Sequence, residues 1–133
     1  MLSVFTVVWV LTTVMMMTDV TFQSTCNTDN LELCSEATRL CGKGTSWDQC
    51  IGLCKCRNEQ ACTTDADHTV QVIRAPFQNR ETYYTCRSLS TMDACQSNER
   101  AMSGNSENKY KILCKCDKTY QPRSLNDRKF VCQ

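Results

Sequence analysis

Cysteine supplies most of the reactive chemistry of this sequence, because the 133 residues include twelve cysteines and a single histidine. Cysteines occur twice as Cys-x-Cys, at Cys54 and Cys56 and again at Cys114 and Cys116. Cysteine-rich zinc sites usually show Cys-x2-Cys spacing and often include histidine. Dense cysteines in a small chain are instead typical of secreted disulfide scaffolds. We therefore predict disulfides, with no metal and no other cofactor.

The sequence offers little support for catalysis. A Ser-His-Asp or Cys-His site needs a histidine that is held beside its nucleophile. His68 is the only histidine, and it lies in a segment without cysteines, residues 63–85. We interpret it as a solvent-exposed side chain, and we expect no catalytic residue and no enzyme activity.

An internal repeat organises the cysteines. The tetrapeptide Leu-Cys-Lys-Cys at residues 53–56 recurs at 113–116, sixty positions later. Such self-similarity indicates repeated structural units. It predicts two tandem cysteine-rich modules, residues 26–62 and 86–133, joined by a connector at 63–85 whose residues suggest an extended chain.

The repeat also predicts one disulfide. Cys41 and Cys50 of the first module have no cysteine counterpart in the second, where Met102 (or Ala101) and Tyr110 take their places. An unpaired half-cystine is a liability in an oxidising compartment, so the loss of two together indicates that they are partners. We predict a Cys41–Cys50 disulfide.

The remaining cysteines divide unevenly between the modules. Five matched cysteines in each module cannot all pair internally, so one bridge joins the modules, or one thiol in each stays free or bridges another chain. We favour an inter-module bridge between Cys62 and Cys132, the last cysteine of each module. The other pairings stay open. The cysteines expected in them are Cys26, Cys34, Cys54, Cys56, Cys86, Cys95, Cys114 and Cys116.

The N-terminal residues indicate the compartment. Residues 1–17 carry no charge and are mostly apolar, which is typical of a secretory signal peptide. We assign residues 1–25 to this signal, with cleavage within 18–25; a short membrane anchor is the alternative. Dense cysteines also fit an oxidising, extracellular destination. We expect a secreted protein, a monomer rather than a disulfide-linked dimer, that binds no nucleic acid and inserts stably into no membrane.

Local periodicity predicts short helices. Leu31, Cys34, Thr38 and Cys41 fall on one face of a helix at 29–42, and residues 90–104 repeat the pattern. A second helix is predicted over 46–56, with its counterpart near 109–116, where strand-like alternation is the alternative. The predicted fold class is small, disulfide-rich and mainly α: two tandem modules resembling helical hairpins, with little β structure.

Basic residues gather toward the C-terminus. Residues 109–133 carry seven basic and two acidic side chains. This segment is either a solvated face or a docking surface for an acidic partner. Trp47 and Tyr110 share a helical stripe with cysteines, which favours core positions, with exposed anchors as the alternative. The candidate binding patch is Lys109, Tyr110, Lys111, Lys115, Lys118 and Arg123.

Two resemblances bear on function. The stretch LCKCRNEQACTTDADHTVQVI, residues 53–73, resembles the end of a cysteine-rich domain in the glial-cell-line-derived neurotrophic factor receptor alpha and growth-arrest-specific receptors. That resemblance implies a helical extracellular module that binds a protein ligand. The chain is also similar in style to secreted venom toxins such as those of centipedes or cone snails, although it carries no specific toxin motif.

These observations together lead to one functional expectation. We expect a secreted disulfide-rich binding protein, a toxin or effector that acts on an extracellular receptor or ion channel. An extracellular receptor-like module is the alternative. Rigid scaffolds suit both, because pre-organised loops lose little entropy on binding.

Overall fold

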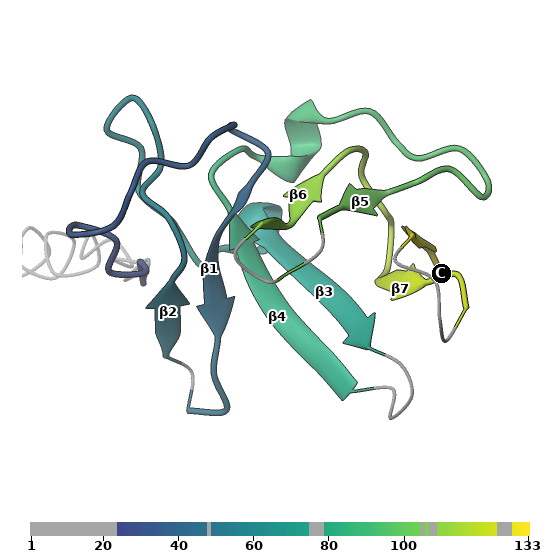
Figure 1. The fold of residues 1–133 in the computed structure, drawn as a ribbon, viewed down its shortest axis with the longest axis horizontal. Coiled ribbons are helices and arrows are strands. Elements are labelled where there is room, and N and C mark those ends of the chain that lie inside the picture. Colours follow the sequence, from purple (N-terminus) through teal and green to yellow (C-terminus); the bar gives the residue numbers. More distant parts are fainter. Residues whose placement is uncertain (1–23, 48, 75–78, 105, 107–108, 125–128) are drawn as a thin grey trace, which may run out of the picture.

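The structure is a computed structural model that describes residues 24–47, 49–74, 79–104, 106, 109–124 and 129–133 (Figure 1). The predicted signal peptide, residues 1–25, therefore lies almost wholly outside the described residues. Within the described ranges, no helix is long and apolar enough to cross a membrane.

The protein is mostly β, so the prediction of a mainly α fold is wrong. The described residues form eight strands and two short 3-10 helices, and they contain no α-helix. The elements are β1 (Leu40–Gly44), β2 (Cys50–Gly52), η1 (Ala66–His68), β3 (Thr69–Arg74), β4 (Asn79–Thr85), η2 (Leu89–Thr91), β5 (Met102–Ser103), β6 (Lys111–Ile112), β7 (Tyr120–Pro122) and β8 (Phe130–Cys132).

The strands form one curled sheet in the order β2-β1-β4-β3-β7-β8-β5-β6. The long β3–β4 hairpin lies at its centre, with β1 and β2 beside it (Figure 1). We call residues 26–62 the first half of the chain and residues 86–133 the second half. The strand at the end of this order, β6, lies beside the first half, because Arg39 forms an antiparallel bridge with Lys111. The Leu40 amide donates to the Tyr110 carbonyl at 3.1 Å, and the Ile112 amide donates to the Thr38 carbonyl at 2.9 Å. We call this junction of residues 38–40 with 110–112 the seam.

Alternation along the strands places the core inside the curl. Successive strand residues point to opposite faces, and in β3 Val70 and Val72 are buried while Gln71 between them is not. β-branched and aromatic residues favour such half-buried strands. The apolar core contains Leu40, Val70, Val72, Tyr83, Leu89, Ala101, Met102, Tyr110, Ile112, Cys114, Cys116, Tyr120 and Phe130.

Residues 29–42 do not form the predicted helix, because their backbone groups form hydrogen bonds with a distant segment of the same chain. The Cys34 amide donates to the Lys55 carbonyl at 2.8 Å, and the Lys55 amide donates to the Glu32 carbonyl at 2.8 Å. Burial of cysteines in an oxidised chain is set by their bridges, so their spacing does not report a helix face. Trp47 and Leu31, both expected on buried helix faces, are 83% and 39% exposed.

All twelve cysteines are in disulfides. The pairs are Cys26–Cys50, Cys34–Cys54, Cys41–Cys62, Cys56–Cys86, Cys95–Cys114 and Cys116–Cys132.

The predicted Cys41–Cys50 disulfide is wrong. Cys50 lies opposite Gly44 in the β1–β2 hairpin, and Gly44 is three residues after Cys41 along β1. Three strand residues span about 10 Å, whereas the Cα atoms of a disulfide lie roughly 4.4–6.8 Å apart. The second half has therefore lost one cysteine from each of two bridges, not both cysteines of one bridge.

The predicted Cys62–Cys132 bridge is also wrong. Cys62 is buried in a cluster of cysteines that all come from residues 26–62 except Cys86. Cys132 lies on β8 and packs against the apolar core. A disulfide does cross between the two cysteine-rich segments, but it joins Cys56 to Cys86.

One hydrogen-bond pattern occurs twice at the offset found in the sequence. Gly42 pairs with Gly52 in the first half, and Met102 pairs with Ile112 sixty residues later. The segment predicted as an extended connector, residues 63–85, contains η1, β3 and all of β4.

The two halves fill the equivalent position differently. A side-chain carbon added at Gly42 would collide with the sulfur atoms of Cys26 and Cys50. Met102 occupies the matching place in the second half and is fully buried in the apolar core.

Candidate functional site: a basic pocket at the seam

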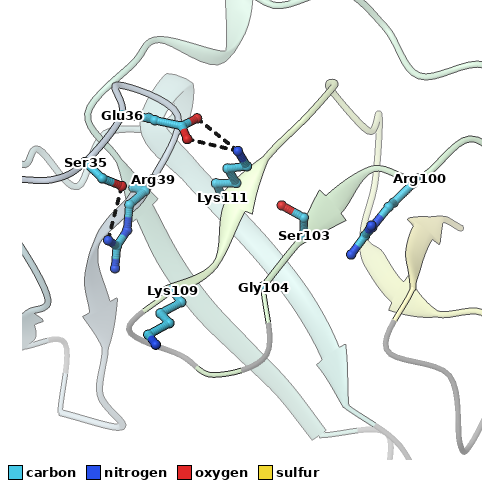
Figure 2. A pocket seen from close by; sticks show the side chains of 8 residues that line it. All are labelled: Ser35, Glu36, Arg39, Arg100, Ser103, Gly104, Lys109 and Lys111. Carbon is cyan, nitrogen blue, oxygen red and sulfur yellow. Dashed lines mark hydrogen bonds and ion pairs between the residues drawn. The ribbon is translucent and has the colours of Figure 1, made fainter.

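A pocket of about 490 Å³ opens on the seam, where the first and second halves of the chain meet (Figure 2). Its lining comes from the segment before β1, the segment before β5, and the β5–β6 hairpin. We call it the seam pocket. Its residues are Ser35, Glu36, Arg39, Arg100, Ser103, Gly104, Lys109 and Lys111.

Strand register aims three of these side chains in one direction. Arg39 is bridged to Lys111, and Lys111 is paired with Ser103 on β5. Residues paired directly across neighbouring strands project from the same face of a sheet, about 4.5–5.5 Å apart at Cβ. That face is the outer one, because the adjacent strand residues Leu40, Ile112 and Met102 are buried in the core.

Hydrogen bonds fix part of the lining. The Arg39 Nη1 group donates to the Ser35 hydroxyl at 3.2 Å. The Lys111 ammonium contacts both oxygens of the Glu36 carboxylate, at 3.0 and 3.1 Å. The Arg39 Nε group is buried and has no hydrogen-bond partner among the described residues.

The seam pocket is electropositive. Among the described lining residues, four side chains are basic and Glu36 is the single carboxylate. Glu36 forms an ion pair with Lys111. The other three basic side chains, Arg39, Arg100 and Lys109, therefore have no acidic neighbour among the described lining residues. A concave surface lined by one sign of charge concentrates ligands of the opposite charge, so the arrangement is suited to binding an anion.

The structure divides the patch that was predicted from sequence. Lys109 and Lys111 line the seam pocket, whereas Lys115, Lys118 and Arg123 do not. Lys118 and Arg123 are exposed elsewhere on the surface, and Lys115 is half-buried beside its bridge partner Ala94.

Tyr110 is a core residue, which is the position that its spacing with the cysteines favoured, and it does not belong to an exposed binding patch. Its side chain is only 8% exposed, and it packs against Tyr83 and Phe130. The alternation Lys109, Tyr110, Lys111, Ile112 points the two lysines outward and the two apolar residues inward.

The two arginines of the pocket, Arg39 and Arg100, were not among the site residues predicted from sequence. A signal for them was present, because Arg39 and Arg100 occupy matching positions of the internal repeat at an offset of sixty-one. The predicted patch came from the basic C-terminal segment, residues 109–133. Arg39 and Arg100 lie outside that segment and come close to it only in the folded chain.

Clusters of cysteine sulfurs elsewhere do not resemble working metal sites. Cys34, Cys56 and Cys86 lie close enough to share an ion, but each of them is in a disulfide. The thiolate is the form of cysteine that binds metals. These clusters are therefore structural.

His68 is also structural in its contacts. Its Nδ1 atom lies 2.8 Å from the Asp65 carboxylate, and its side chain is 20% exposed, so the expectation of a solvent-exposed histidine is wrong. Asp65 also accepts from the His68 amide at 3.1 Å, which caps η1. The hydrogen bond from His68 holds the pKa of Asp65 below its usual range.

Comparison with known proteins identifies no family. No protein-family model matches the sequence, and no curated protein matches it. Among solved structures, the crystal structure of unliganded Argos is similar, with a TM-score of 0.48 and 14% sequence identity over 75% of this chain. The chain spans about half of the Argos chain, 54% of its length.

Proposed function

We propose that the protein is a secreted, disulfide-rich binding protein that acts on an extracellular receptor or ion channel as a toxin or effector, and that it docks through the seam pocket. The seam pocket is the observation that carries this proposal, because it gathers cations from distant parts of the chain into one hollow. The described residues contain no α-helix, so the helical fold that the receptor resemblance implies does not support the receptor-like alternative.

The disulfide framework supports the same proposal. Six bridges hold a chain whose strands are short, and five of the eight strands have three residues or fewer. Disulfide-dense chains of this size belong to oxidising, extracellular environments. A surface held in place by such bridges loses little entropy when it binds.

The test measures binding of the oxidised, fluorescently labelled chain to intact neuronal and epithelial cells. We expect saturable binding that disappears when the cells are treated with trypsin, because the target is a surface protein. The variant Arg39→Glu with Arg100→Glu should bind at least about tenfold more weakly, a loss of about 1.4 kcal/mol.

A matched control separates the pocket from general charge. Lys118→Glu with Arg123→Glu makes the same change in net charge at exposed sites outside the seam pocket. We expect this control to bind like the original chain. Absence of saturable binding, or equal loss in both variants, would contradict the proposal.

A further inference from the structure

The unpartnered donor in the seam pocket points to the chemistry of the ligand. A buried N–H group normally has a hydrogen-bond partner, and each exception requires an explanation. Arg39 Nε is such a donor, and it lies in a side chain that lines the pocket. Because the Nε atom itself is closed to solvent, a ligand oxygen that binds the guanidinium would reach this donor only with a shift of the Arg39 side chain.

The number of donors exceeds what one carboxylate needs. A carboxylate has two oxygens, and a single arginine can satisfy both in a bidentate contact. The seam pocket offers two arginines and a lysine without acidic partners in the lining, together with the hydroxyl of Ser103. A tetrahedral oxyanion with three terminal oxygens fits this set better, because its oxygens point in different directions.

Backbone geometry brings one of these cations to the others. Gly104 has φ of +124°, and a side-chain carbon there would come within 2.6 Å of the Lys109 carbonyl oxygen. Only glycine readily adopts such a conformation. The close approach places Lys109 next to the end of β5, where Ser103 lies.

We propose that the seam pocket binds the sulfate ester of an O-sulfotyrosine on the protein partner. This inference rests on the proposed function, since the partner is the extracellular target named there. Aryl sulfate esters are tetrahedral at sulfur and carry three terminal oxygens. A volume of about 490 Å³ lies within the range of small-molecule sites, roughly 300–1,000 Å³, and accommodates the ester with part of its ring.

A sulfated polysaccharide is less well matched. A long polyanion binds best along an extended basic surface, because its affinity grows with the number of charges that it neutralises. This chain has 15 basic and 14 acidic residues, close to neutrality. Its basic lining is confined to one hollow, which suits a single sulfate group.

The direct test uses two small probes, N-acetyl O-sulfotyrosine amide and N-acetyl tyrosine amide. We expect the sulfated probe to shift the Arg39 Nε–H resonance in nitrogen-15 NMR spectra and to bind at least about tenfold more tightly than the unsulfated one. Arg39→Gln and Arg39→Lys should both abolish the preference for the sulfated probe. Glutamine removes the charge, and lysine keeps the charge but lacks the planar guanidinium that binds two oxygens at once.

A heparin oligosaccharide serves as the competing ligand. Equal binding of the two tyrosine probes would overturn the inference, as would a sulfate preference that survives Arg39→Gln. Heparin binding that depends on Arg39, with no binding of the sulfotyrosine probe, would also overturn it and assign the pocket to a polysaccharide.

A cell experiment separates this inference from the proposed function. Chlorate treatment blocks sulfation in cells, and heparinase removes only heparan sulfate. We expect chlorate, but not heparinase, to reduce binding of the chain. Binding that needs the seam pocket but resists chlorate would overturn the sulfotyrosine inference and leave the proposed function standing. Absence of any cell binding would refute the proposed function, and the NMR titration would still decide the chemistry of the pocket.

Discussion

The ring of Tyr110 lies edge-on to the ring of Tyr83, with centroids 6.2 Å apart and planes inclined at 87°. Phe130 also packs against Tyr110, with ring centroids 5.5 Å apart and planes inclined at 70°. This aromatic contact joins the β3–β4 hairpin to the second half of the chain. Such edge-to-face pairs contribute beyond the area that they bury.

Tyr110→Ala should therefore destabilise the fold. Truncation of a buried aromatic side chain costs about 3–5 kcal/mol, because it removes buried area and leaves a cavity. We expect a loss of this size in the free energy of unfolding, measured by guanidinium denaturation with the disulfides intact. Tyr110→Phe keeps the ring and should cost less than about 1.5 kcal/mol. Equal losses in the two variants would argue against ring packing as the cause.

Trp47→Ala should have almost no effect on stability. Trp47 is 83% exposed in the segment between β1 and β2. Surface substitutions away from special features usually change stability by less than about 0.5 kcal/mol. The same denaturation experiment measures this. A loss of several kcal/mol would show that Trp47 is buried, as the helical interpretation required.

Paired cysteine replacements test the disulfide pattern. Cys41→Ala with Cys62→Ala removes one bridge and should leave no free thiol. Cys41→Ala with Cys50→Ala breaks two bridges and should leave Cys26 and Cys62 unpaired. Thiol titration of the denatured, unreduced proteins distinguishes these outcomes.

The stability change gives an independent measure of the first pair. Removal of a native disulfide from a small secreted domain typically costs about 2–5 kcal/mol, and we expect a loss in this range for the Cys41→Ala, Cys62→Ala variant. Free thiols in that variant, and none in the Cys41→Ala, Cys50→Ala variant, would contradict the pairing.

The Asp65–His68 contact predicts a pH dependence. Because the pKa of Asp65 is lower in the folded chain than in the unfolded chain, its contribution to stability is complete above the unfolded pKa of about 4. The contribution is lost as the pH falls through the lower, folded pKa. Asp65→Asn should therefore differ most from the original chain at pH 5 and above, and the difference should shrink below about pH 4.

Urea denaturation at several pH values measures this difference. His68→Gln removes the largest cause of the lowered pKa, so it should weaken the pH dependence without deleting the carboxylate. A difference between the original chain and Asp65→Asn that stays constant from pH 7 to pH 3 would count against this role of Asp65.

The sequence carried more information about the disulfide scaffold than about secondary structure. Cysteine density predicted a disulfide scaffold, and the offset of sixty matched the Gly42–Gly52 pair to the Met102–Ile112 pair. β6 lies where strand-like alternation was the alternative near 109–116, and β3 and β4 lie in the segment expected to be extended. Most of the other strands were not predicted because they are two or three residues long, too short to establish an alternating pattern. The cysteines also imposed a spacing that imitates a helix.

Only part of the seam pocket could be predicted from the sequence, because the pocket too depends on contacts between distant residues. Lys109 and Lys111 stand in a run of basic residues, so composition alone drew attention to them. Arg39 reaches them only through the bridge to Lys111 across the seam. A contact between residues so distant in the chain depends on closure of the whole sheet, which no local pattern encodes.

The crowding at Gly42 has a consequence for how this sequence can vary. The Cys26–Cys50 bridge leaves no room for a side chain at residue 42. In the second half, Tyr110 stands in place of Cys50. The strand register sets Met102 at the position of Gly42, so Ala101 is the counterpart of Cys41. A side chain at residue 42 without loss of the Cys26–Cys50 bridge would produce a collision, and glycine at residue 102 would leave a cavity in the core. Homologous chains should therefore show these positions changing together, with glycine wherever the bridge is retained and a bulky apolar residue wherever it is lost.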